Sequence, residues 1–336
     1  MGVGGADTDS PASGPPRWFL GAAFFVTAAA WTAGRSRGLP STDLSVASPG
    51  VFLLLCSYFA LADPRIRAPL AGWCRTSRVR RVLVACALLA LPYLAYALPL
   101  RVFSVQGFLA LLLYATLPLL ALSLPRKREE SVAADLAVLL LVWFPLEFRW
   151  LPQIWGWPPG QTGHFLDGLL GVILAVYAFD VVRGLPGIGF MPPPRRRDWL
   201  LAGSGCLLFV PFAVGFGMLT GFLTPSAHLP NLLAATARIL GIFLVTAVPE
   251  ELLFRGILQN LLHRWSGRPV FSLATAAVVF GAAHLNVGAH AEWRLALLAA
   301  FAGVLYGWLY RAGGSLMAPA LAHTAIDSIW TLLFRR

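Results

Sequence analysis

Charged residues are scarce in this chain of 336 residues: Lys, Arg, Asp and Glu together make up 12% of it, and Lys occurs only once. Soluble domains carry about 25% charged residues. Hydrophobic residues make up 58% of the chain, and its mean hydropathy is +0.71. This composition excludes a cytosolic enzyme and a disordered regulator, and it indicates a polytopic membrane protein.

Cysteine and acidic residues are also few. The four cysteines lack the spacing typical of metal ligands, so we interpret them as packing residues rather than as a disulfide framework. The shortage of acids leaves a net charge of +11. In a soluble protein this excess would indicate nucleic-acid binding, but basic loops are typical of the cytoplasmic side of a membrane protein. We therefore expect no nucleic-acid partner.

Continuous apolar runs fill the chain between residues 18 and 333. At roughly 20 residues for each helix, the length allows about eight to eleven spans. A membrane barrel is disfavoured, because its strands alternate between apolar and polar residues. With the N-terminus inside, about two thirds of the basic residues fall in inside segments, as the positive-inside rule requires. We expect an all-α, polytopic transmembrane bundle in a bacterial plasma membrane.

Composition divides the chain into four parts. Residues 1–16 are rich in Gly, Pro and Ser, which is typical of a disordered tail. Residues 17–190 are expected to form an N-terminal transmembrane bundle, to which the sequence assigns no role. Residues 191–198 (MPPPRRRD) are expected to form a Pro/Arg linker, and residues 199–336 a second bundle with polar residues inside its spans.

Ionisable residues in mid-span gather near the C-terminus. An ionisable group within lipid costs several kcal/mol, so its presence there indicates a function. We interpret six residues in three neighbouring spans as a candidate catalytic site: Glu250, Glu251, Arg255, His284, His323 and Asp327.

The two adjacent glutamates are expected to have different roles. Glu251 and Arg255 are four residues apart, so they share a helical face and can form an ion pair. Glu250 is rotated from Glu251 by about 100°. We expect Arg255 to hold Glu251 ionised, and Glu250 to act as a general base. Pro249 is expected to kink the helix and widen a cavity beside Glu250.

The other three candidates follow the same helical spacing. His323 and Asp327 are four residues apart and therefore lie on one face of a helix. His284 follows Phe280 by one turn. Because packed helices lie about 8–10 Å apart, the three spans can bring carboxylates and two imidazoles into one buried layer.

These segments resemble the motifs of the CAAX protease and bacteriocin-processing family of intramembrane endopeptidases, also called CPBP or Abi proteins. Residues 250–255 (EELLFR) resemble the EExxxR motif, residues 280–284 (FGAAH) the FxxxH motif, and residues 323–327 (HTAID) the Hxxx(N/D) motif. All three stand in the family's order, and the resemblance covers residues 235–336.

The resemblance implies an endopeptidase that cleaves near the C-terminus of a lipidated, CAAX-like substrate or of another small membrane-associated one. It implies that Glu250 and His284 activate water and that His323 and Asp327 stabilise the oxyanion. The prenyl-protein enzymes carry Asn where this chain has Asp327. An ionised Asp has no proton to donate, so Asp327 would be protonated, orient His323 or bind a metal.

The residues of the candidate site are consistent with two kinds of chemistry. Glu and His are zinc ligands, so a zinc ion held by Glu250, His284 and His323 is one option. The HExxH motif is absent, and we favour a glutamate-activated water that needs no cofactor.

Two other functions also stay open. One is a non-catalytic membrane scaffold or immunity-type partner protein; the other is a proton-coupled transporter, disfavoured because the polar residues occupy only one half of the chain. The expected partners are the lipid bilayer and a peptide or protein substrate. The sequence does not indicate an oligomeric state.

Overall fold

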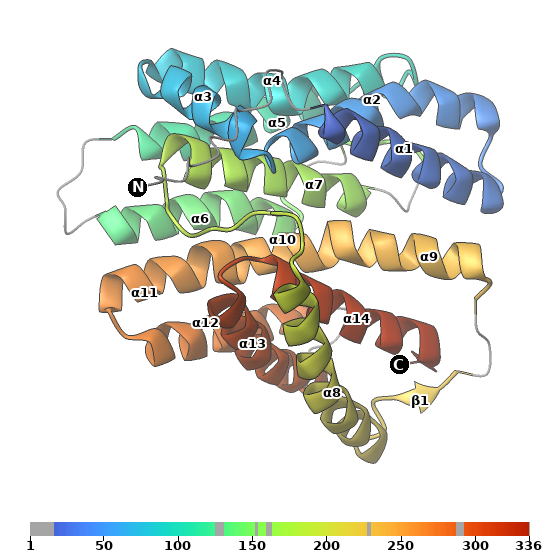
Figure 1. The fold of residues 1–336 in the computed structure, drawn as a ribbon. Coiled ribbons are helices and arrows are strands. Elements are labelled where there is room, and N and C mark those ends of the chain that lie inside the picture. The colour runs from blue at the N-terminus through green and yellow to red at the C-terminus, as the bar shows by residue number, and fades with distance from the viewer. Residues whose placement is uncertain are drawn as a thin grey trace, which may run out of the picture.

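The structure is a computed structural model that describes residues 17–124, 131–151, 154–158, 163–226, 230–286 and 292–335. The tail predicted at residues 1–16 lies outside these ranges. Helices make up nearly all of the regular structure in the described part of the chain (Figure 1). One short antiparallel pairing joins β1 (Thr224–Pro225) to β2 (Phe334–Arg335) near the C-terminus.

The helices fall into two parts along the chain. The N-terminal part contains α1 (Trp18–Ser36), α2 (Ser41–Ala60), α3 (Pro64–Arg75), α4 (Arg78–Ala97), α5 (Val105–Leu122), α6 (Ser131–Glu147) and α7 (Gly163–Val176), which continues into the π-helical segment η2 (Tyr177–Val182). The C-terminal part contains α8 (Arg196–Leu219), α9 (Leu232–Gly241), η3 (Ile242–Ala247), α10 (Val248–Glu251), η4 (Leu252–Gln259), α11 (Asn260–Ser266), α12 (Pro269–Ala283), the 3-10 turn η5 (His284–Asn286), α13 (Trp293–Gly313) and α14 (Met317–Leu333).

Six helices of the described ranges are long and apolar enough to cross a bilayer. They are α2, α4, α5, α8, α13 and the continuous helix from Leu232 to Ser266. The outer face of α8 is apolar, with Leu207 and Leu208 80% and 77% exposed, as expected of a surface that faces lipid. The predicted all-α polytopic bundle and its multi-pass membrane location are therefore confirmed. The range of eight to eleven spans stays a prediction, because shorter apolar helices such as α12 do not meet the length criterion.

The longest helix, Leu232–Ser266, carries the first motif and consists of α9, η3, α10, η4 and α11. Its 35 residues span about 52 Å, which exceeds the roughly 30 Å of a bilayer's hydrocarbon core. Gly267 ends the helix with a φ of 65°, and Pro269 starts α12. Glu250 lies near the middle of this helix, roughly 25 Å from either end.

Two π-helical segments, η3 and η4, flank the short stretch that contains Pro249. Proline has no backbone N–H, and its ring crowds the preceding turn, so it disturbs the regular ladder of helical hydrogen bonds. Departures of this kind are frequent at functional sites. The distortion falls directly beside Glu250 and Glu251, where the sequence predicts a kink.

Helices α6 and α7 lie between the long helix and the remaining N-terminal helices (Figure 1). In detail, α6 packs on η4 and α11, whereas α7 packs on η3 and α10. The buried apolar side chains of both parts form one continuous cluster. The predicted division into residues 17–190 and 199–336 stays a prediction, but the two parts share a core.

The connection at residues 183–195 crosses from η2 to α8 (Figure 1). Helix α8 begins at Arg196, within the predicted linker. Fully buried Asp198 accepts a hydrogen bond from the backbone N–H of Arg195 at 2.8 Å and pairs with its guanidinium at 3.3 Å. Arg195 also donates to the carbonyl of Gly313. The start of α8 is thereby fixed to the end of α13.

Candidate active site

The six predicted site residues come from two helices and one helix end. Glu250, Glu251 and Arg255 lie on the long helix, His284 follows the last residue of α12, and His323 lies on α14. Asp327 stands one turn after His323 on α14. The structure joins five of them through ion-pair contacts, and it places His284 with Glu250 on one cavity.

Glu251 and Arg255 form the buried ion pair that their spacing predicts. Their side chains are 0% and 1% exposed, and Arg255 Nη1 donates to Glu251 Oε1 at 3.1 Å. Nη2 of Arg255 donates to the carbonyl of Gly303 on α13 at 3.2 Å, and the guanidinium lies 4.3 Å from the ring centroid of Phe280. A buried charge needs such compensation, because an unpaired one is strongly destabilising.

Glu251 also holds His323, a contact that the sequence did not predict. Nδ1 of His323 lies 2.8 Å from Glu251 Oε1. A carboxylate only accepts hydrogen bonds, so His323 donates from Nδ1. Its other nitrogen, Nε2, then lies 3.5 Å from Asp327 Oδ2 and 3.8 Å from Glu250 Oε2. The Arg255–Glu251 pair therefore orients His323 toward the other two carboxylates.

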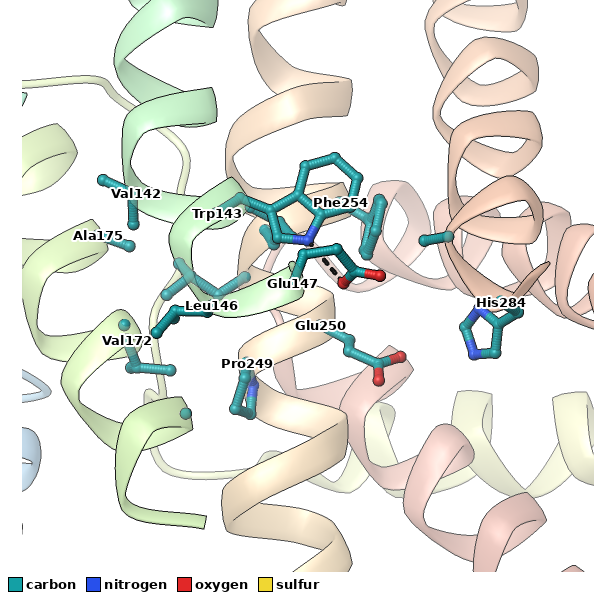
Figure 2. Close-up of a pocket in the computed structure, with 15 residues that line it drawn as sticks. Val142, Trp143, Leu146, Glu147, Val172, Ala175, Pro249, Glu250, Phe254 and His284 are labelled. Carbon is teal, nitrogen blue, oxygen red and sulfur yellow. Dashed lines mark hydrogen bonds between the residues drawn. The ribbon is translucent and has the colours of Figure 1, made fainter. Parts of the chain in front are cut away.

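Glu250 and His284 face a cavity. The side chain of Glu250 is 29% exposed, and its Oε2 has no hydrogen-bond partner among the described residues. Nδ1 of His284 lies 2.8 Å from the carbonyl of Phe280, to which it must donate, so Nε2 is left as an acceptor. Figure 2 shows the carboxylate of Glu250 and the ring of His284 on the same open space.

The cavity has a volume of about 200 Å³ and lies between the two parts of the chain. It is lined by Val142, Trp143, Leu146, Glu147, Gly168, Gly171, Val172, Ala175, Pro249, Glu250, Leu252, Leu253, Phe254, Ala283 and His284. Eight of these residues belong to α6 and α7, so the N-terminal part forms one wall. His323 and Asp327 are not part of the lining.

Sequence reasoning missed two residues of the site. Tyr306 on α13 is buried, and its ring stacks on His323 with centroids 4.8 Å apart and an interplanar angle of 14°. Glu147 reaches the cavity from the end of α6. Neither lies in a motif. A tyrosine in an apolar helix is typical of packing, and a glutamate at the end of a span is typical of an interface.

The donor set does not fit a metal ion. Among the residues that the structure describes, no group of three His, Cys, Asp or Glu side chains is arranged to hold one. The zinc option requires Glu250, His284 and His323 to converge, and these three side chains do not form such a group.

Close packing of small residues sets the position of His284. A Cβ added to Gly281 on α12 would lie 2.7 Å from both the carbonyl of Ala296 and the Cβ of Ala300 on α13. Small residues allow helices in a membrane to approach in this way. Since His284 stands three residues after Gly281, the contact also places the imidazole.

Replacing Gly281 with Val is expected to lower the free energy of unfolding by about 1–3 kcal/mol, because overpacking forces the helices apart. The displacement of His284 should also lower any hydrolytic activity. Thermal unfolding in detergent measures the first effect. Gly203→Val on α8 is the control, since nothing lies within 4 Å of a Cβ there. Equal melting temperatures for the two variants would contradict this account of the packing.

Comparison with known proteins agrees with the motifs. Residues 231–329 match the family described as type II CAAX prenyl endopeptidase Rce1-like. An uncharacterized protein, YpbD of Bacillus subtilis (strain 168), is 32% identical over 92 residues, which cover 27% of this chain and 43% of that protein. The chain thus spans less than half the length of this relative. No solved structure matches. The predicted family resemblance is confirmed for the segment that carries all six site residues.

Proposed function

Because residues 231–329 carry the Rce1-like family domain, we propose that this membrane protein is an intramembrane endopeptidase in which Glu250 activates water. One observation carries the proposal: within the bundle, Glu250, whose Oε2 has no hydrogen-bond partner among the described residues, lines the same cavity as the imidazole of His284. A general base and a second proton-transfer group in reach of one water molecule are what peptide hydrolysis requires.

The reaction proceeds in two stages. Glu250 takes a proton from water, His284 holds that water through Nε2, and the hydroxide oxygen bonds to the scissile carbonyl carbon. The electron pair of the C=O bond moves to oxygen and forms the oxyanion. When the C–N bond breaks, the proton on Glu250 passes to the leaving amine. The products are a carboxylic acid, which loses its remaining proton to solvent, and a free amine.

His323 is the donor that this arrangement offers to the oxyanion. In its protonated form it donates from Nδ1 to Glu251 and from Nε2 toward the substrate. Asp327 Oδ2 lies 3.5 Å from Nε2, which is an ion-pair contact between the carboxylate and the imidazole. Among the three roles left open by the sequence, this distance supports the one in which Asp327 orients His323.

The test is hydrolysis by the purified full chain in lipid vesicles. A set of apolar peptides with CAAX-like C-termini, prenylated and unprenylated, is incubated with the protein in water enriched in ¹⁸O. Mass spectrometry is expected to find a new C-terminus that carries one ¹⁸O atom. The same measurement also tests the substrate class, because a comparison of prenylated with unprenylated peptides shows whether cleavage needs a prenyl group. A non-catalytic scaffold or a transporter would give no product.

Removal of metals is expected to leave this activity within about twofold of its starting value, because carboxylate and imidazole groups alone supply the proton transfers. The purified protein is treated with a strong chelator, dialysed and assayed in the vesicles. Zinc is then added back to an aliquot. Loss of activity with recovery on zinc addition would contradict the water mechanism and favour the metal-dependent one.

A further inference from the structure

The cavity contains a second carboxylate, Glu147, which lies in neither the motifs nor the matched segment 231–329. It is the last residue of α6. The indole Nε1 of Trp143 donates to its Oε2 at 3.1 Å. Figure 2 shows Glu147 directed into the space that Glu250 also faces.

Aromatic contacts tie this wall to the proposed catalytic residues. The ring of Trp143 lies 5.2 Å from that of Phe254 on the long helix, and Phe254 lies 4.9 Å from Phe280. Phe280 in turn contacts the ring of His284 edge-on at 4.7 Å. The carboxylate of Glu147 is therefore held in a defined place relative to His284.

The walls between the carboxylates are apolar. Val142 and Leu146 on α6, Val172 on α7 and Leu253 on the long helix contribute to the lining. Gly171 lets Leu146 pack closely against α7, because a Cβ there would lie 2.5 Å from Cδ1 of Leu146. An apolar cavity of about 150 Å³ holds a benzene molecule, so this one of about 200 Å³ has room for one long side chain.

The chemistry of these walls selects a particular kind of occupant. A purely apolar group would remove water from Glu147 and leave its charge without compensation, which is costly. An acidic group would be repelled by two carboxylates. A Lys or Arg side chain suits both the apolar walls and the carboxylate. Its methylene stem covers apolar surface, and its charged end can pair with Glu147.

We propose that the cavity is a specificity subsite in which Glu147 binds the cationic end of a Lys or Arg side chain of the substrate. This inference rests on the proposed function, because it takes the bound side chain to belong to a peptide that is cleaved beside the subsite. It gives the N-terminal part of the chain a role in choosing the substrate.

The inference is tested by binding, separately from hydrolysis. The full-length Glu250→Gln protein in vesicles is titrated with two fluorescent peptides that differ at one position, Lys or its neutral isostere norleucine. Hydrogen bonds to charged groups change affinities by about tenfold to a hundredfold, so the Lys peptide is expected to bind at least about tenfold more tightly. Adding Glu147→Gln should reduce this preference to less than about twofold.

Both glutamine replacements are expected to leave the protein folded. The amide oxygen introduced by Glu147→Gln can still accept from Trp143, and Oε2 of Glu250 has no hydrogen-bond partner among the described atoms to lose. Asp167→Asn is the matched control: Trp155 Nε1 donates to Asp167 Oδ1 at 3.1 Å, yet Asp167 does not line the cavity. It should keep the preference for Lys. The inference is overturned if the two peptides bind equally, or if the preference for Lys survives Glu147→Gln. Equal binding is also the result expected if the cavity holds a prenyl chain.

The hydrolysis assay separates the two claims. If the wild-type chain cleaves no peptide, the proposed function fails, while the binding preference still decides the role of Glu147. If the wild-type chain cleaves both peptides, Glu147→Gln should lower kcat/KM for the Lys peptide alone. A purely structural role would lower both values by the same factor and would overturn the inference.

Discussion

Replacing Glu250 with Gln is expected to lower kcat for peptide hydrolysis by about 10²- to 10⁴-fold, the usual contribution of a general base. Gln has nearly the same shape but cannot take a proton from water. Because Oε2 of Glu250 has no hydrogen-bond partner among the described atoms, the replacement removes no such bond at that oxygen. The melting temperature should therefore stay close to that of the unchanged protein.

The control for this variant is Glu292→Gln. Glu292 pairs with Arg294 at 2.7 Å at the start of α13, and it does not line the cavity. Its replacement should leave kcat within about twofold, because Glu292 lies outside the cavity and has no part in the proposed chemistry. If Glu250→Gln retains full activity in vesicles, Glu250 is not the base and the mechanism proposed here is wrong.

Residues on one helix were predictable from sequence spacing. Arg255 follows Glu251 by four positions, and the structure pairs their side chains at 3.1 Å. The same rule places His323 and Asp327 on one face of α14, where Nε2 of His323 lies 3.5 Å from Oδ2 of Asp327. Helical periodicity alone carries such predictions, because residues four apart in any α-helix are neighbours.

Contacts between helices were not predictable in the same way. The bond from His323 to Glu251 joins residues 72 positions apart, and it depends on how α14 crosses the long helix. Spacing states which face a residue occupies but not which helix lies opposite that face. For this reason the sequence paired His323 only with Asp327 and left Glu251 as a partner of Arg255 alone.

The share of the N-terminal part in the cavity was hidden for a related reason. Composition separates apolar residues 17–190 from the polar spans that follow, and function was therefore assigned to the second part alone. The wall formed by α6 and α7 is built mainly from Val, Leu, Ala and Gly, which are typical of any membrane helix. Glu147 is the charged residue of that wall, and its place at a helix end is typical of an interfacial residue.

Replacing Arg255 with Met is expected to be strongly destabilising, because it removes the permanent cation from buried Glu251 and leaves only the imidazole of His323 beside it. Breaking a buried ion pair costs about 3–5 kcal/mol, whereas replacing both partners with neutral residues is often nearly neutral. The double variant Glu251→Gln with Arg255→Met should therefore recover most of the lost melting temperature. Thermal unfolding in detergent compares the two variants.

The double variant should nevertheless remain inactive. The amide oxygen introduced by Glu251→Gln can still accept from Nδ1 of His323, but it brings no negative charge to hold the imidazolium that donates to the oxyanion. Loss of an oxyanion donor costs about 10²- to 10³-fold in kcat, and we expect a loss of this size in the folded double variant. Recovery of both stability and hydrolysis would show that the Arg255–Glu251 pair serves only to hold the bundle together. Recovery of stability without hydrolysis would show that the negative charge of Glu251 is needed to hold His323 as an imidazolium.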